Sequence, residues 1–365
     1  MSLEDLFIRM SIDFGTFGSA FGWCVYLRDD DDPSARRIFT YDQWPGQPTA
    51  SVKTRTALLL DRNGEVVAWG HEANRLWALH RHDRRDRGWQ YGDKFKMSLA
   101  KLEDGPRSYR SMAIDRYEDV ENLVTLFLRC IRERAVQEIE ASGYRAEDVL
   151  YCITVPNIWT DRQKAVMREC ALKAGFPAED GRLILALEPE AAAQHARVAG
   201  VQVTRSDGTD GTDGGEGADR ALLNTPGRRF VVADCGGGTI DNTSYFVEPT
   251  GHMVEVGGVS GEMCGGAFVN AAFEEQVLVP RLGGAALFSK LQNACPEGIE
   301  ELLDAWERAK LNVTVGQDTP CICPSWPALH VGCPRGCDGR WPRYRTELTT
   351  RSWSHQMKSR TRSKQ

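Results

Sequence analysis

Residues 230–247 read FVVADCGGGTIDNTSYFV, and this stretch decides how the rest of the chain is interpreted. The apolar run from Phe230 to Ala233 predicts a buried strand that ends in Asp234. Three glycines and Thr239 follow, and then apolar alternation resumes. A loop whose backbone N–H groups must approach phosphate oxygens needs glycines, because a Cβ atom would block the approach. An Asp at the strand end can hold Mg²⁺ beside those phosphates, directly or through water. For this stretch alone, an ordinary glycine-rich hairpin is the alternative.

A second stretch, near the start of the chain, has the same layout. Residues 11–26, SIDFGTFGSAFGWCVY, run from a strand through an Asp and a Gly-Thr turn into another strand. Asp13 corresponds to Asp234, and the Gly-Thr pair at 15–16 corresponds to the pair at 238–239. Phosphoryl chemistry needs donors on both sides of the phosphate chain and carboxylates for the metal. Two such loops therefore predict two lobes that clamp one nucleotide.

Two further stretches connect the pattern to a family. Residues 153–175, ITVPNIWTDRQKAVMRECALKAG, and residues 183–195, LILALEPEAAAQH, follow in order between the two loops. Together the four motifs resemble the nucleotide-binding domain of heat-shock protein 70, in the actin, hexokinase and heat-shock protein 70 superfamily of ATPases. Sugar kinases and actin share the loops but not Glu188-Pro189 followed by three alanines. The DFGT motif and the Trp-rich first lobe are closest to the divergent heat-shock 70 kDa protein 12 branch, and the resemblance covers about residues 8–315.

The resemblance implies an α/β protein with the two-lobed, actin-like (ribonuclease H-like) ATPase fold. The implied reaction is slow hydrolysis of ATP to ADP and phosphate, with the two lobes closing around Mg·ATP. Asp13 and Asp234 would support Mg²⁺ through its waters. The groups that cradle the phosphates would come from Gly15, Thr16, Phe17, Gly236, Gly237, Gly238 and Thr239, and from the glycine pair Gly265 and Gly266 at a helix start.

The resemblance also implies residues that arrange the attacking water. In the family, a lysine within the segment that corresponds to 89–97, WQYGDKFKM, points at the γ-phosphate and this water. Lys94 and Lys96 are both candidates, spacing does not decide between them, and a solvated surface lysine is the alternative. Glu188 would orient the water or reach the water shell of the metal, and Asp241 would accept a proton. A helix-start carboxylate favoured by the helix dipole is the other interpretation of Glu188.

Length and composition allow two domains. The chain has 365 residues, of which 41% are hydrophobic and 26% charged, enough for a substantial core. We expect a first lobe at 1–200, a flexible acidic insert at 201–223, a partial second lobe at 224–315 and a disordered basic tail at 316–365. The tail carries a net charge of about +6 and the rest about −12, which argues against nucleic-acid binding by the main domain. No apolar run approaches the length of a membrane span.

The cysteines suggest a compartment and mark the point where the family pattern stops. The first seven of eleven are widely scattered, which is typical of reduced thiols in a cytoplasmic protein. Intact family members continue with a strand, a helix and a third glycine motif that holds the adenosine, and nothing after Val315 resembles these. The last four cysteines, at 321, 323, 333 and 337, could hold zinc, but their spacing fits poorly, and an unrelated tail is the simpler interpretation.

We therefore expect a second lobe that is incomplete. An ATPase that binds nucleotide, with co-chaperone or client proteins as further partners, is the main hypothesis. One alternative is a catalytically dead remnant that acts as a partner-binding scaffold. Another is a small-molecule kinase on the same fold, although no signature of an acceptor site is seen.

Overall fold

The computed structural model describes residues 6–27, 36–47, 50–80, 82–84, 86–100, 117–201, 223–294 and 296–311. The chain divides into two units, Met1–Gly266 and Ala267–Gln365. This boundary does not coincide with the expected lobe limits at 200 and 224, which stay a prediction. Most of the expected insert, 202–222, and the whole tail, 316–365, with its four cysteines, lie outside the described residues.

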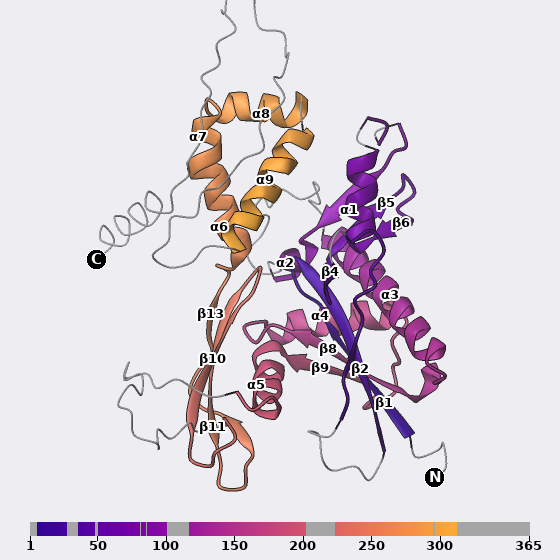
Figure 1. The fold of residues 1–365 in the computed structure, drawn as a ribbon, viewed down its shortest axis with the longest axis vertical. Helices are drawn as coiled ribbons and strands as arrows, with labels where there is room; N and C mark the ends of the chain where they lie inside the picture. Colours follow the sequence, from indigo (N-terminus) through magenta and orange to yellow (C-terminus); the bar gives the residue numbers. More distant parts are fainter. Residues whose placement is uncertain are drawn as a thin grey trace, which may run out of the picture. The chain divides into compact units, whose positions relative to one another are not determined.

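A mixed sheet forms the centre of the first unit (Figure 1). Its strands are β1 (Leu6–Asp13), β2 (Gly18–Leu27), β3 (Phe39–Thr40), β4 (Thr54–Arg55), β8 (Val149–Val155) and β9 (Leu183–Leu187). The strand order is β3-β2-β1-β8-β9, and β4 also pairs with β2. β1, β8 and β9 run parallel, whereas β2 is antiparallel to β1. Because parallel strands end on the same side, Asp13 and the residues that follow β8 and β9 come to one edge of the sheet.

Two helices supply most of the core against this sheet. They are α3 (Tyr117–Ala141) and α4 (Asp161–Lys173). Phe127, Leu128 and Ile131 of α3 are completely buried, and each buried side chain of this size stabilises the fold by about 1.5–3 kcal/mol. Thr160 begins α4 with a capping box, in which its side chain and that of Gln163 each accept a backbone N–H. That satisfies donors the first helical turn leaves free.

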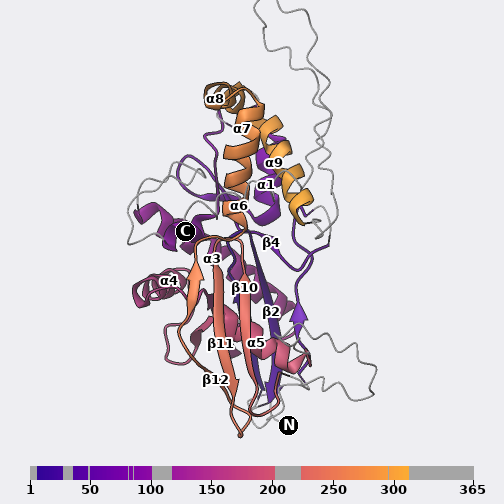
Figure 2. The ribbon, with the colours of Figure 1, turned by 90° about the vertical axis from the view of Figure 1, so that its left-hand side faces the viewer.

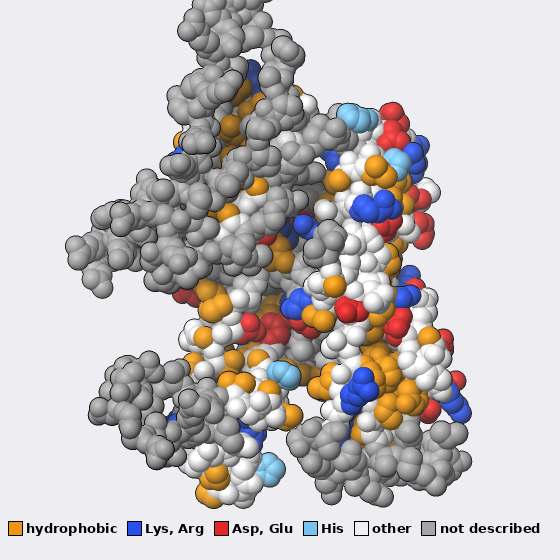
Figure 3. All heavy atoms as spheres, in the orientation of Figure 1, with side chains coloured by type: hydrophobic (Ala, Val, Ile, Leu, Met, Phe, Trp, Pro, Cys, Tyr) orange, Lys and Arg blue, Asp and Glu red, His pale blue; other side chains and the backbone are white. Residues whose placement is uncertain are grey.

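A smaller three-stranded sheet lies beside the first one, in the order β6-β5-β7. Its elements and their neighbours are β5 (Ala57–Leu60), β6 (Val66–Trp69), α1 (Gly70–Leu79), β7 (Gln90–Asp93) and α2 (Phe95–Ala100). The turn between β5 and β6 uses Gly64 at φ +83°, a left-handed conformation that favours glycine. Figure 3 shows acidic, basic and His side chains together over α1 and this sheet, so the surface there is highly charged.

The second phosphate-loop motif lies in another sheet of the first unit. Its strands are β10 (Arg229–Cys235), β11 (Ile240–Val247), β12 (Met253–Glu255) and β13 (Ser260–Glu262), with β11 paired to the other three. Helix α5 (Glu188–Val198) contacts β9 of the first sheet and β10 of this one, as Figures 1 and 2 show. Ala193 of α5 is buried against Phe230 and Tyr245. The Glu-Pro-Glu-Ala-Ala-Ala motif therefore connects the two sheets through one helix.

The second unit is helical in its described residues. Its elements are α6 (Gly266–Phe273), the π-helical turn η4 (Glu274–Leu278), α7 (Val279–Arg281), α8 (Ala285–Ala294) and α9 (Pro296–Leu311). Phe273, Leu278, Phe288 and Ile299 form its core, and the Trp306 ring stacks on Phe273 with centroids 4.0 Å apart. Across the described ranges of both units, no helix combines the length and apolar content needed to cross a bilayer.

Candidate functional site

Both predicted phosphate loops are turns between antiparallel strands. Loop one, residues 14–17, connects β1 to β2, and Asp13 pairs with Ala20 at its base. Loop two, residues 236–239, connects β10 to β11, and Asp234 pairs with Asp241 near its base. The hairpin and the phosphate-loop interpretations are therefore compatible, since each loop is a hairpin turn with an Asp beside it.

The glycines of these loops stand where a side chain would collide with its surroundings. A Cβ atom on Gly237 would lie 2.2 Å from the Phe17 ring, and one on Gly15 would lie 2.3 Å from the Gly18 carbonyl oxygen. A Cβ atom on Gly265 would lie 2.6 Å from the Gly236 carbonyl oxygen. The absence of side chains therefore lets loop two pack against loop one and against the segment before α6.

Several predicted cradle amides donate hydrogen bonds inside loop two and its neighbour. Gly265 N–H donates to the Gly238 carbonyl at 3.2 Å, and Gly266 N–H donates to the Gly236 carbonyl at 3.1 Å. Gly236 N–H itself donates to the Thr239 carbonyl at 3.0 Å. These bonds give loop two a defined shape, with the glycine pair at the end of the first unit bound to it.

The two loop aspartates share one electrostatic environment. Burial raises the pKa of Asp234, and the charges of Asp241 and, to a smaller extent, Asp13 raise it further. Lys96 and Lys53 act in the opposite direction on the same pKa. The geometric contact between the two loops is that of Gly237 with the Phe17 ring, and the role of the two aspartates stays a prediction.

Asp241 is 1% exposed and connects loop two to the first sheet. Its carboxylate accepts hydrogen bonds from the Thr239 hydroxyl at 3.1 Å and from the Ile158 N–H at 3.3 Å. Burial raises the pKa of Asp241, while these two hydrogen bonds oppose that rise. The Asn157 side-chain amide also donates to the Thr243 hydroxyl at 3.1 Å. The turn after β8 therefore attaches to β11 at two points.

The structure separates the two candidate lysines. Lys96 Nζ lies 2.6 Å from Glu188 Oε1 and donates to the Phe14 carbonyl at 2.5 Å. The side chains of this pair are 5% and 18% exposed, so Lys96 joins α2, loop one and the start of α5. Lys94 Nζ instead lies 3.7 Å from Asp93 and 5.5 Å from the centre of the Phe17 ring.

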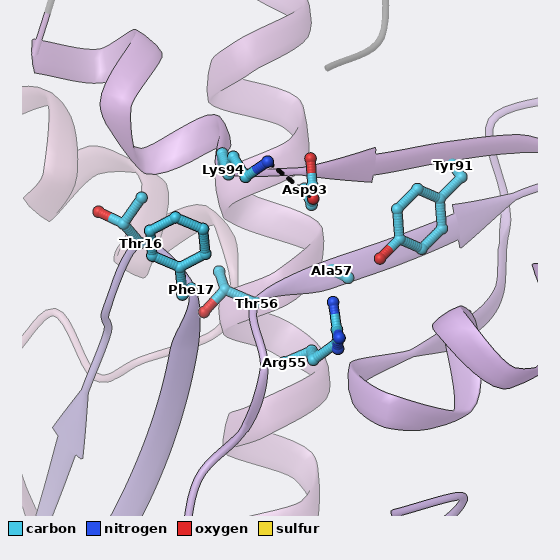
Figure 4. A pocket seen from close by; sticks show the side chains of 8 residues that line it. All are labelled: Thr16, Phe17, Arg55, Thr56, Ala57, Tyr91, Asp93 and Lys94. Carbon is cyan, nitrogen blue, oxygen red and sulfur yellow. Dashed lines mark ion pairs between the residues drawn. The ribbon is translucent and has the colours of Figure 1, made fainter. Parts of the chain in front are cut away.

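Lys94 belongs to a small pocket beside loop one (Figure 4). The pocket holds about 10 Å³, roughly one water molecule, which is far too small for a nucleotide. It is lined by Thr16, Phe17, Arg55, Thr56, Ala57, Tyr91, Asp93 and Lys94. Lys94 has φ +56°, the left-handed region that side-chain-bearing residues rarely adopt. Geometry thus favours Lys96 over Lys94 as the lysine beside the predicted catalytic carboxylates.

Lys53 was not predicted as a site residue. Its Nζ lies 2.7 Å from Asp13 Oδ2, so the two side chains form an ion pair. Thr56 was not predicted either, and its hydroxyl donates to the Gly15 carbonyl at 2.7 Å. Both residues stand about forty positions after loop one, and nothing in their local sequence marks them. The pairing of β4 with β2 brings them there.

The side chains at the two loops decide whether a magnesium ion could be held there. In the described part of the chain, no three His, Cys, Asp or Glu side chains are grouped to hold a metal. Mg²⁺ commonly uses only one or two carboxylates, together with phosphate oxygens and water. Asp13 and Asp234, at the bases of the two loops, are carboxylates of this kind, and their donor chemistry would suit a magnesium ion held through water.

Comparison with known proteins finds distant relatives. No family model matches the chain. Human heat shock 70 kDa protein 12B is 28% identical over 345 residues, which cover 83% of this chain and 49% of that protein. The mouse and human heat shock 70 kDa proteins 12A are 26% and 25% identical over 348 residues, 84% of this chain and 50% of each protein. The chain is a distant homologue of the heat shock 70 kDa proteins 12A and 12B. It spans about half the length of these relatives.

The homology to heat shock 70 kDa protein 12 confirms the resemblance inferred from the four motifs. The described elements also confirm the predicted mixed α/β class. Among solved structures, MreB5 of Spiroplasma citri bound to ADP is similar with a TM-score of 0.40 and 13% identity. That match covers 74% of this chain and 56% of the MreB5 chain.

Proposed function

We propose that this homologue of heat shock 70 kDa protein 12 binds ATP, with Mg²⁺, by its phosphate chain between the two loops and hydrolyses it slowly. The observation that carries the proposal is the packing of loop two against loop one at Gly237 and Phe17, beside the buried Lys96–Glu188 pair, with Asp13 and Asp234 at the bases of the two loops. Phosphoryl chemistry needs backbone close to the phosphates, carboxylates for a metal and a cation for the developing charge. The glycine loop, the aspartate on each loop and the buried lysine are groups of these kinds.

Each side chain has a role that its contacts support. The Phe14 carbonyl and Glu188 hold the Lys96 ammonium in place, so that it can stabilise negative charge on a terminal phosphate without rearrangement. The second carboxylate oxygen of Glu188 can accept a proton from an attacking water. Asp241 accepts hydrogen bonds from the Thr239 hydroxyl and the Ile158 N–H, and so attaches loop two to the turn after β8. Magnesium, held by Asp13 and Asp234 through water, would neutralise charge on the phosphate oxygens.

A scaffold that binds partners without catalysis is the second candidate. The Phe17 ring favours it, because the ring packs against Gly237 and occupies space between the two loops. Co-chaperone or client proteins are proposed partners in either case, by homology with heat shock 70 kDa protein 12. A reducing location in the cytoplasm is also proposed, since the described cysteines Cys24, Cys130, Cys152, Cys170, Cys235 and Cys264 are free thiols.

The test combines a titration with an assay of phosphate release, both on the full chain. ATP with Mg²⁺ should bind and raise the melting temperature, and phosphate should appear without any added acceptor. Glu188→Gln should lower the rate of release by about a hundredfold or more while ATP still binds. Glu121→Gln is the matched control, because that carboxylate is 23% exposed and ion-paired with Lys173, yet belongs to α3.

The outcomes separate the candidates. Binding of ATP without phosphate release would favour the scaffold over the ATPase. Absence of binding at millimolar ATP would refute both the nucleotide site and its chemistry. Release only after addition of a sugar or another small acceptor would point to a kinase instead.

A further inference from the structure

An ammonium group stands at the carboxylate of loop one. Lys53 Nζ is 2.7 Å from Asp13 Oδ2, and the two side chains are 53% and 41% exposed. Neither residue is in the small pocket beside Phe17. The contact therefore places a positive charge at a carboxylate that the proposed function assigns to the metal.

The backbone around Lys53 is held so that its side chain lies along loop one. Lys53 N–H donates to the Ser51 hydroxyl at 3.1 Å, and the next residue, Thr54, pairs with Ser19 of β2. A Cβ atom on Gly18 would lie 3.4 Å from Lys53 Cβ and 3.7 Å from Lys53 Cδ. The aliphatic part of Lys53 therefore lies close beside Gly18, the first residue after loop one, and its ammonium group reaches Asp13.

The ion pair changes the charge that loop one presents to a ligand. An unpaired carboxylate beside a phosphate site repels a polyanionic ligand, and an ammonium group 2.7 Å from the Asp13 carboxylate offsets much of that repulsion.

We propose that Lys53 is a built-in counter-ion for Asp13, which lets the site bind the phosphate chain of a nucleotide without a divalent metal. The inference rests on the proposed nucleotide site and specifies how its charge is balanced. Magnesium then improves binding but is not required for it. The long, half-exposed side chain of Lys53 can leave Asp13 when a metal and its water shell arrive.

The experiment measures the affinity for fluorescent mant-ADP in EDTA and in excess Mg²⁺. The wild-type chain should bind in EDTA within about tenfold of its affinity in Mg²⁺. Lys53→Met should bind about tenfold more weakly than wild type in EDTA, because the repulsion is then uncompensated, and should recover most of that loss in Mg²⁺. Lys53→Arg keeps the charge and should behave like wild type in both buffers.

A matched control is available on α4. Lys173 is 58% exposed and ion-paired with Glu121 at 3.5 Å, so Lys173→Met also removes an exposed, paired ammonium. It should leave both affinities unchanged. Circular dichroism melting of each variant shows whether it is folded, and the ratio of the two affinities does not depend on the fraction of folded protein.

Two results would overturn the inference while leaving the nucleotide site intact. One is a wild-type chain that binds mant-ADP only in Mg²⁺. The other is a Lys53→Met chain that loses affinity equally in both buffers or in neither. Lack of binding by the wild-type chain in both buffers would instead remove the proposed nucleotide site, and the inference with it.

Discussion

Breaking the Lys96–Glu188 pair should cost far more stability than breaking an ordinary surface pair. The charged atoms lie 2.6 Å apart, and the lysine side chain is only 5% exposed. At an effective dielectric constant of about 20, their attraction is about 6 kcal/mol before the cost of desolvation. Removal of one partner of a buried pair typically costs about 3–5 kcal/mol, and the 18% exposure of Glu188 places this pair near the lower limit.

We therefore expect Lys96→Met to lower the free energy of unfolding by about 3 kcal/mol, because Glu188 loses its cation. Glu188→Gln should cost about 2 kcal/mol, since an amide oxygen still accepts a hydrogen bond from Lys96. The double variant, Lys96→Met with Glu188→Gln, should lower the free energy of unfolding by less than the sum of the two single losses. The difference, which is the coupling energy between the two residues, should be about 2 kcal/mol. Urea unfolding followed by far-ultraviolet circular dichroism measures all three values.

A second double-mutant cycle, on the exposed pair of Lys173 and Glu121 in the same chain, is the control. The atoms of this pair are 3.5 Å apart, with side chains 58% and 23% exposed. Its coupling should stay below about 0.5 kcal/mol, as is usual for surface pairs. If the two cycles give equal coupling energies, Lys96 is not held by Glu188 as described, and the roles built on that pair fail.

Three further predictions follow from the described contacts, each checked by urea unfolding. Gly237→Ala should lower the free energy of unfolding by about 1–3 kcal/mol, because its Cβ would lie 2.2 Å from the Phe17 ring, and Phe17→Ala in the same chain should restore most of the loss. Burial lowers the pKa of His71 from its ordinary 6.5. As the pH falls through 6.5, the imidazole of the unfolded chain is protonated before that of the folded chain, so protonation favours unfolding and the free energy of unfolding decreases. His71→Gln should therefore show a smaller drop than wild type when the unfolding free energies above and below pH 6.5 are compared. Thr160→Ala removes the side-chain acceptor of a helix cap and should cost about 1 kcal/mol; an unchanged value would contradict the capping geometry.

Local patterns were enough to predict the elements that hold the loops. Apolar residues recur at spacings of three and four between Val120 and Ile139, as in a helix, and α3 buries that face. Apolar runs that end in Asp13 and Asp234 predicted two strands followed by glycine turns, which are β1 and β10. These features succeed because each depends on a few neighbouring residues and on the period of a helix or strand.

Choices that depend on distant contacts could not be made from the sequence. Lys94 and Lys96 are two positions apart and chemically identical, so only the folded chain shows that Lys96 meets Glu188, 92 residues later. Lys53 carries no motif, and its place beside Asp13 depends on strand β4 pairing with β2. Such contacts arise from the arrangement of whole elements, which local periodicity does not specify.

The two loops look alike in sequence, but they play unequal parts in the contact between them. Loop one carries side chains, and its Phe17 ring packs against Gly237, where a Cβ atom would be only 2.2 Å away. The glycines of loop two therefore satisfy two requirements, since they bend the turn and they also admit the aromatic ring of the other loop. A run of three glycines suggests close approach of a backbone to some partner. In this chain that partner includes Phe17, so a phosphate chain that enters between the loops must share or displace the space of the ring.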